Sequence, residues 1–153
     1  MYTCMGLGSC VGVIAADFEA NVSGMLHLML PETFKGSEVT NPAKFADTGI
    51  PELFRLLESA GARRNRLVLA YCGGSQVFKN RHGATLDIGA RNSIAVESQL
   101  RKIQARVIAT DVGGSLGRTL VVDCRSGLVT VRTVARGERT LCNLRNPEKQ
   151  EAA

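Results

Sequence analysis

The chain has 153 residues, 44% of them hydrophobic, and a formal net charge of +5 at pH 7. A chain of this length and composition can bury a core as one domain, which excludes an intrinsically disordered protein. No apolar run reaches the roughly 20 residues of a membrane-spanning helix, and the N-terminal residues lack the pattern of a signal peptide, so we expect a cytoplasmic protein without membrane insertion.

Five cysteines are scattered along the chain, at positions 4, 10, 72, 124 and 142. No CxxC pair occurs, and neither histidine, at positions 27 and 82, has a partner ligand nearby in the sequence. We therefore expect reduced thiols, with no disulfide framework and no metal site. The basic residues are dispersed and the chain has no Trp, so nucleic-acid binding is unsupported.

The first part of the chain is predicted to form two strands, residues 10–16 and 22–30, joined by a polar turn around residues 18–21. Pro31 ends the second strand, and a polar loop follows to about residue 41. Apolar residues then recur at helical spacing between Ile50 and Ala60, with Gly61 at the position of a C-terminal cap. Pro51 either opens this helix or kinks a longer one that begins near Pro42.

The second part begins with an apolar run at residues 67–72, which is predicted to be a buried strand. Residues 88–103 have the pattern of a second helix. Three more strands are predicted, at residues 107–110, 119–124 and 128–134, the last two joined by a hairpin turn. Strands at both ends with two main helices between them predict an α/β or α+β domain with a mixed β-sheet core.

Cys10 and His27 are the candidate nucleophile and base. A thiol with its ordinary pKa of about 8.5 supplies little thiolate at neutral pH, and a neighbouring imidazole that accepts the proton increases the supply. If the first two strands form a hairpin with a two- or four-residue loop, positions 12 and 27 lie opposite each other. Cys10 then lies on the same face as His27, one diagonal step away. A loop one residue longer or shorter would place the two side chains on opposite faces.

Glycines precede Cys10 and follow a later strand. Gly6 and Gly8 leave the backbone free to turn its N–H groups toward a developing oxyanion. The Gly73-Gly74 turn follows a predicted strand and could bring a further loop to the same rim. The predicted substrate-binding residues are Gly8, Ser9, Gly73 and Gly74.

The same spacing also fits a structural interpretation, because free thiols beside glycine and histidines on apolar strands are common in protein cores. His82 lies among charged residues, where a solvated side chain is the simpler interpretation. Cys72, Cys124 and Cys142 have no base nearby in the sequence and are interpreted as core or surface thiols. Spacing alone therefore leaves the reaction open.

Six short segments are more informative about the function than the spacing of single residues. They are residues 6–11 (GLGSCV), 27–31 (HLMLP), 44–48 (KFADT), 73–75 (GGS), 88–92 (IGARN) and 111–114 (DVGG). In this order they resemble the signature of the CheD family of chemotaxis proteins. The resemblance covers roughly residues 4 to 134, and the combination is far more specific than any one segment.

The resemblance implies a fold like that of the deamidase domain of cytotoxic necrotizing factor toxins. It implies hydrolysis of selected glutamine side chains on the cytoplasmic helices of chemoreceptors, with Cys10 forming a thioester and His27 as its base. No metal or organic cofactor is required. The resemblance also implies a second partner, the CheC phosphatase.

One position departs from the family pattern. Members usually have a threonine six residues before the nucleophile as the third residue of the site, and here that position is Cys4. This departure keeps an alternative open, a catalytically weakened adaptor that binds receptors or CheC. The predicted domain spans residues 1–143, followed by a polar tail at residues 144–153.

Overall fold

The computed structural model describes residues 1–36, 38–77 and 87–148. The strands of this part of the chain are β1 (Tyr2–Leu7), β2 (Val11–Asp17), β3 (Val22–Leu28), β4 (Val68–Gly73), β5 (Arg106–Val112), β6 (Arg118–Asp123), β7 (Leu128–Thr133) and β8 (Gly137–Asn143). Its helices are α1 (Ala46–Ser59) and α2 (Ile88–Lys102), with short 3-10 turns at Pro42–Lys44 and Arg64–Arg66.

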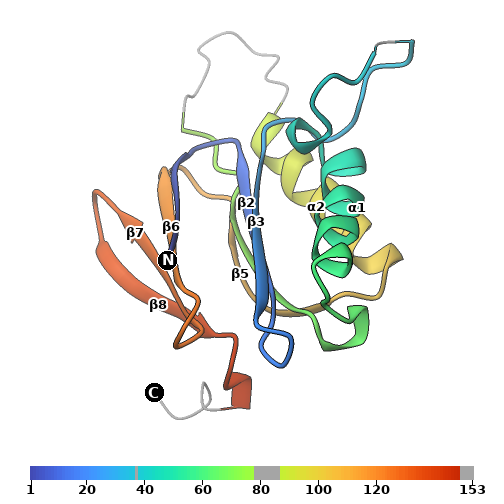
Figure 1. Cartoon of the computed structure of the whole chain (residues 1–153). Coiled ribbons are helices and arrows are strands. Elements are labelled where there is room, and N and C mark those ends of the chain that lie inside the picture. The colour runs from blue at the N-terminus through green and yellow to red at the C-terminus, as the bar shows by residue number, and fades with distance from the viewer. Residues whose placement is uncertain (37, 78–86, 149–153) are drawn as a thin grey trace, which may run out of the picture.

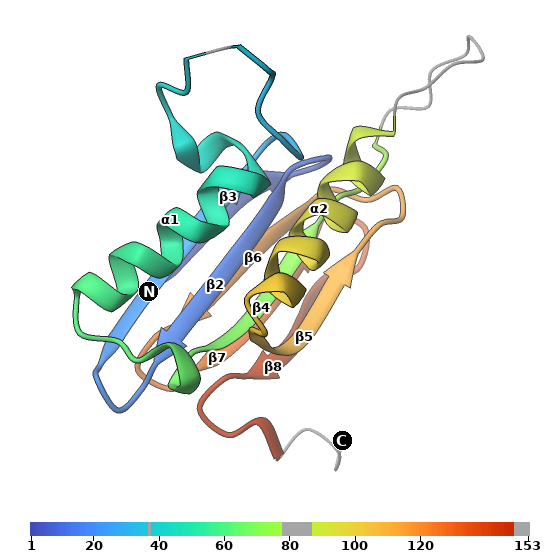
Figure 2. The ribbon, with the colours of Figure 1, turned by 90° about the vertical axis from the view of Figure 1, so that its right-hand side faces the viewer.

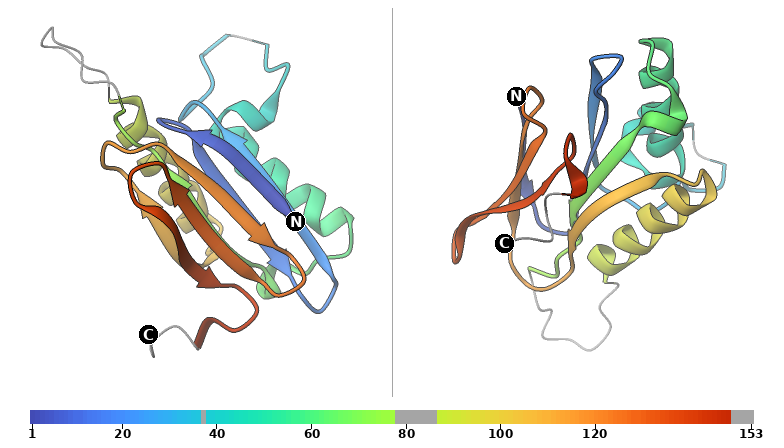
Figure 3. Two further views of the ribbon diagram at one scale, coloured as in Figure 1. Left: turned by 90° about the vertical axis from the view of Figure 1, so that its left-hand side faces the viewer. Right: turned by 90° about the horizontal axis from the view of Figure 1, so that it is seen from below.

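The strands form two four-stranded sheets that pack face to face. The outer sheet has the order β1-β6-β7-β8 and is antiparallel throughout. The central sheet has the order β3-β2-β4-β5 and is mixed, because β4 and β5 run parallel. Helices α1 and α2 cover the other face of the central sheet (Figures 1 and 2). The end-on view in Figure 3 shows the resulting three layers.

Each side of the central sheet has its own hydrophobic core. Alternate residues of β2, such as Val11 and Val13, pack toward the helices with Phe54 of α1. Ile14 points the other way and packs with Leu120 of the outer sheet. Because both faces of the sheet are covered, β2 is buried along its whole length.

The predicted fold class is confirmed, as an α+β domain in which two helices and two sheets form one sandwich. All six predicted strands and both helices are present within a few residues of their expected ends. Pro51 lies inside α1, and Pro42 begins a separate 3-10 turn.

Strands β1 and β8 were not predicted. The register of β1 shifts between Cys4 and Leu7, which interrupts the alternation that marks a strand. Strand β8 lies at the sheet edge and is mostly exposed and polar, with Cys142 as its buried residue. Both strands pair with partners far away in the sequence, and those pairings, rather than local pattern, make them strands.

The predicted tail begins inside the packed structure. Leu144 is buried between the sheets, and its N–H donates to the carbonyl oxygen of Gly127 at 2.8 Å. Residues 149–153 lie outside the described residues, as does His82. Neither helix in the described part of the chain has the length and apolar character needed to cross a membrane.

Candidate functional site

The β2–β3 hairpin has the register that places Cys10 and His27 on one face. Its turn contains four residues, 18–21, and Gly12 lies directly opposite His27. Asp17 holds the turn, because its carboxylate accepts the N–H groups of Glu19 and Ala20, both at 3.1 Å. The register predicted for a four-residue loop is confirmed.

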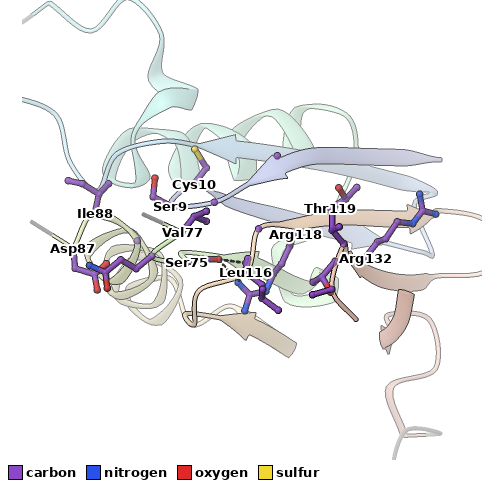
Figure 4. A pocket seen from close by; sticks show the side chains of 18 residues that line it. Ser9, Cys10, Ser75, Val77, Asp87, Ile88, Leu116, Arg118, Thr119 and Arg132 are labelled. Atoms are coloured by element: carbon purple, nitrogen blue, oxygen red, sulfur yellow. Dashed lines mark hydrogen bonds between the residues drawn. The ribbon is translucent and has the colours of Figure 1, made fainter. Parts of the chain in front are cut away.

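Cys10 lies immediately before β2, on the face of the central sheet that packs against the outer sheet. It lines a cavity of about 1060 Å³ that opens between the two sheets at this end of the molecule. Figure 4 shows Ser9 and Cys10 on one wall, with Leu116 and Arg118 from the β5–β6 connection and the start of β6 on another. The pKa of the Cys10 thiol is raised above its ordinary value by burial, an effect that its own backbone N–H, which favours the thiolate, only partly offsets.

His27 lies on β3, an edge strand of the central sheet, and its side chain is exposed. Since His27 pairs with Gly12 and Cys10 precedes Gly12 by two residues, the imidazole and the thiol share one face of the sheet. His27 is not among the residues that line the cavity, and among the described residues no hydrogen bond joins it to Cys10. The register therefore places Cys10 and His27 as diagonal neighbours on one face of the sheet, and of the two only Cys10 lines the cavity.

Cys4 lies above the same hairpin. It is buried in β1, and its sulfur lies 3.2 Å from the point where a side chain on Gly12 would begin. Because Gly12 has no side chain, Cys4 occupies the space over the strand position opposite His27. Burial, and then the nearby Cys10, raises the pKa of Cys4 to about 11. Cys4, which the sequence analysis considered as a third residue of the site, thus lies close to Gly12 and Cys10.

The four predicted substrate-binding residues fall into two groups. Gly8 and Ser9 line the cavity beside Cys10. Gly73 and Gly74 instead contact the backbone of Cys10: the Gly74 N–H donates to the Cys10 carbonyl oxygen at 2.8 Å. A side chain on Gly73, whose φ is +125°, would begin 2.1 Å from that same oxygen. These two glycines let β4 approach Cys10 closely.

Asn92 is a site residue to which the sequence analysis assigned no role. Its side chain is completely buried, and its Nδ2 donates to the carbonyl oxygens of Ser9 and Met29, both at 2.9 Å. Helix α2 comes close enough because Gly89 packs against the carbonyl oxygens of Gly74 and Ser75. In the sequence, the feature that could have pointed to Asn92 is the segment 88–92, which is one of the six short segments that resemble the family signature.

Arg118 is a second residue that the sequence analysis missed. It lines the cavity, and its guanidinium lies 3.1 Å from the Asp111 carboxylate. It also donates to the Ser75 hydroxyl at 2.5 Å and to the Gly113 carbonyl oxygen at 2.8 Å. These contacts tie the β4 and β5 ends to β6 and hold the cavity wall that faces Cys10.

The described residues contain no group of three or more His, Cys, Asp or Glu side chains arranged to hold a metal ion. What the arrangement offers is a thiol, an imidazole on the same face and backbone N–H groups around an open cavity. That set of groups can perform acyl transfer through a covalent intermediate.

Comparisons with family models and with individual proteins both give the same family. The model of the family described as "CheD chemotactic sensory transduction" matches residues 29–133, a stretch that begins beyond Cys10 and His27. The chain is 40% identical over 138 residues to the "Probable chemoreceptor glutamine deamidase CheD" of Clostridium botulinum strain Hall, covering 90% of this chain and 85% of that protein. It is 44% identical over 131 residues to the protein of the same name from Desulforamulus reducens, covering 85% and 79% respectively.

Proposed function

Because this chain belongs to the CheD family, we propose that it hydrolyses glutamine side chains of chemoreceptors to glutamate and releases ammonia. The observation that carries the proposal is the placement of the Cys10 thiol at the cavity wall, on the same face of the hairpin as His27. The names of the relatives supply the substrate class, and the cysteine–imidazole geometry supplies a chemistry suited to it.

The reaction proceeds in two stages. His27 accepts the Cys10 proton, and the thiolate attacks the amide carbon of the glutamine side chain, whose oxygen becomes an oxyanion. The C–N bond breaks as the His27 imidazolium donates its proton to the leaving nitrogen, so ammonia departs and a thioester remains. A water molecule, deprotonated by His27, then attacks the thioester, and glutamate leaves with the thiol restored.

The open setting suits a macromolecular substrate. His27 is exposed at a sheet edge, and Cys10 lines a cavity whose walls include Gly8 and Ser9. A glutamine presented on the cytoplasmic helices of a receptor reaches such a site, and contacts remote from the amide contribute to its recognition. Free glutamine lacks those contacts, so it is expected to be a very poor substrate.

The direct test incubates the protein with a receptor cytoplasmic fragment and measures ammonia release and conversion of glutamine to glutamate by peptide mass spectrometry. Cys10→Ala is expected to abolish the reaction, and His27→Ala to slow it by about 100-fold or more. Cys124→Ala is the matched control, since Cys124 is a partly exposed thiol that does not line the cavity. Equal activity of wild type and Cys10→Ala would refute the proposal.

Cys4 favours a second candidate, an adaptor that keeps the fold and binds receptors or the CheC phosphatase with deamidation weakened. Burial raises the pKa of the Cys4 thiol to about 11, and among the described residues no hydrogen bond joins Cys4 to His27. Binding of the receptor fragment or of CheC by this protein, without release of ammonia, would support this candidate. Measuring binding and ammonia release on the same samples separates the two functions.

A further inference from the structure

Asn92 connects the segment that carries the nucleophile to the segment that carries the base. Its Nδ2 donates one hydrogen bond to the carbonyl oxygen of Ser9, the residue before Cys10, and one to that of Met29, two residues after His27. The two bonds use both Nδ2 hydrogens. Turning the amide over would place Oδ1 against two carbonyl oxygens, so the orientation of the side chain is determined.

The bond to Ser9 determines the direction of the Cys10 N–H. In a trans peptide the carbonyl and the following N–H point to opposite sides. The Ser9 carbonyl oxygen is held toward Asn92, and therefore the Cys10 N–H is directed away from α2. It lies on the side of the Cys10 sulfur, where it favours the thiolate form.

The peptide on the other side of Cys10 is held as well, by the Gly74 N–H that donates to the Cys10 carbonyl oxygen at 2.8 Å. Both peptide planes that flank the Cys10 Cα atom are thus tied to neighbouring elements, one by α2 and one by the end of β4. Of these two ties, the one from Asn92 comes from a side chain and can be removed without changing the backbone.

The hydrogen bonds that the Asn92 side chain makes in the described part of the chain all come from its Nδ2. Its Oδ1 is buried and has no hydrogen-bond partner among the described residues, and an orphaned buried acceptor destabilises a fold. The two donors of Nδ2 are what the position supplies.

We propose that Asn92 is a positioning residue for the deamidation reaction, which holds the Cys10 N–H toward the developing oxyanion and keeps the ends of the Cys10 and His27 segments together. This inference rests on the proposed function for its reaction, and on the two Nδ2 hydrogen bonds for its geometry. Backbone N–H groups aimed in advance at an oxyanion stabilise the transition state more than the ground state. Loss of Asn92 should therefore lower kcat and leave KM nearly unchanged.

The experiment uses the full-length protein with three substitutions. Asn92→Ala removes both donors, and Asn92→Asp keeps the shape of the side chain while replacing Nδ2 by an oxygen. Thr48→Val is the matched control: its hydroxyl on α1 donates to the Pro42 carbonyl oxygen at 2.7 Å, away from Cys10. Two readouts are taken: steady-state deamidation of a receptor fragment, and the pH dependence of iodoacetamide labelling of the Cys10 peptide.

We expect Asn92→Ala and Asn92→Asp to lower kcat by about tenfold or more, with KM changed less than about twofold. The midpoint of Cys10 labelling should move to higher pH by about one unit, the size of one hydrogen bond to a charged group. Thr48→Val should lower the melting temperature without either effect. At low pH, a protonated carboxyl group in Asn92→Asp can donate to one of the two carbonyl oxygens, so the activity of this variant relative to wild type at the same pH should partly recover.

Unchanged kcat and an unchanged labelling midpoint in folded Asn92 variants would overturn the inference. So would a failure of both variants to fold, because Asn92 would then act on the whole structure rather than on Cys10. If wild type and Cys10→Ala release ammonia equally, the proposed function fails. The labelling midpoint still decides the placement of the Cys10 N–H, because that measurement needs no receptor.

Discussion

Gly73→Ala is the sharpest test of how β4 holds Cys10, the proposed nucleophile. Gly73 has a φ of +125°, and a Cβ atom there would lie 2.1 Å from the Cys10 carbonyl oxygen and 3.1 Å from the Val11 Cα atom. Both contacts are with backbone, so no side chain can rotate aside. The substitution must therefore push the start of β2 away from β4.

The size of the effect follows from that distance. Cβ atoms do not approach other heavy atoms closer than 3.0 Å, so the Cys10 backbone must move by about 1 Å, a displacement that can cost on the order of 100-fold in rate. The alanine also costs about 1–2 kcal/mol for its left-handed backbone and about 1–3 kcal/mol for the overlap. We expect kcat to fall by about 100-fold in protein that still folds.

Gly61→Ala provides the control, since Gly61, at the end of α1, has a φ of +104° but no atom within 4 Å of the place that its Cβ atom would take. It should share the backbone cost and keep full activity. The assay is ammonia release from a receptor fragment, per folded molecule, with stability measured by urea unfolding. If Gly73→Ala lost stability to the same extent as Gly61→Ala and kept its activity, the proposed contact with Cys10 would be refuted.

Three further predictions concern charge and sulfur chemistry. Cys4→Thr should raise the deamidation rate by roughly fivefold, because a hydroxyl orients an imidazole better than a thiol does, by about 1 kcal/mol; equal rates for wild type, Cys4→Thr and Cys4→Ala would exclude an orienting role. Iodoacetamide should label Cys10 faster than Cys72 or Cys142 at neutral pH, as burial raises the pKa of both others to about 12, and mass spectrometry of the labelled peptides measures this. Burial disfavours the Asp17 carboxylate, but hydrogen bonds from the Arg63 N–H, the Arg66 guanidinium and a turn N–H outweigh burial and lower its pKa from 3.8 to about 2. The folded state therefore favours ionised Asp17, so this stabilisation is present above pH 4 and is lost as the pH falls toward 2. Urea unfolding at pH 7 should find Asp17→Asn about 2 kcal/mol less stable than wild type. Between pH 4 and pH 2 the stability of this variant should depend less on pH than that of wild type.

Local patterns were enough to predict six of the eight strands in the described part of the chain, both helices and the candidate pair. The length of the four-residue polar turn determines the β2–β3 register, and this register places Gly12 opposite His27. The helices follow from apolar spacing, because one face of each must be buried. The resemblance to the toxin deamidase fold and the roles of Cys10 and His27 stay predictions.

What only the tertiary structure decided are the contacts between segments far apart in the chain. Asn92 reaches Ser9 across 83 residues, and Cys4 lies over Gly12 only because β1 pairs with β6 in the other sheet. Gly73 and Gly74 look in sequence like a loop that binds substrate, whereas in the structure they pack against the Cys10 backbone. Sequence periodicity reports which face of an element is buried, but which element covers it depends on how the whole chain packs.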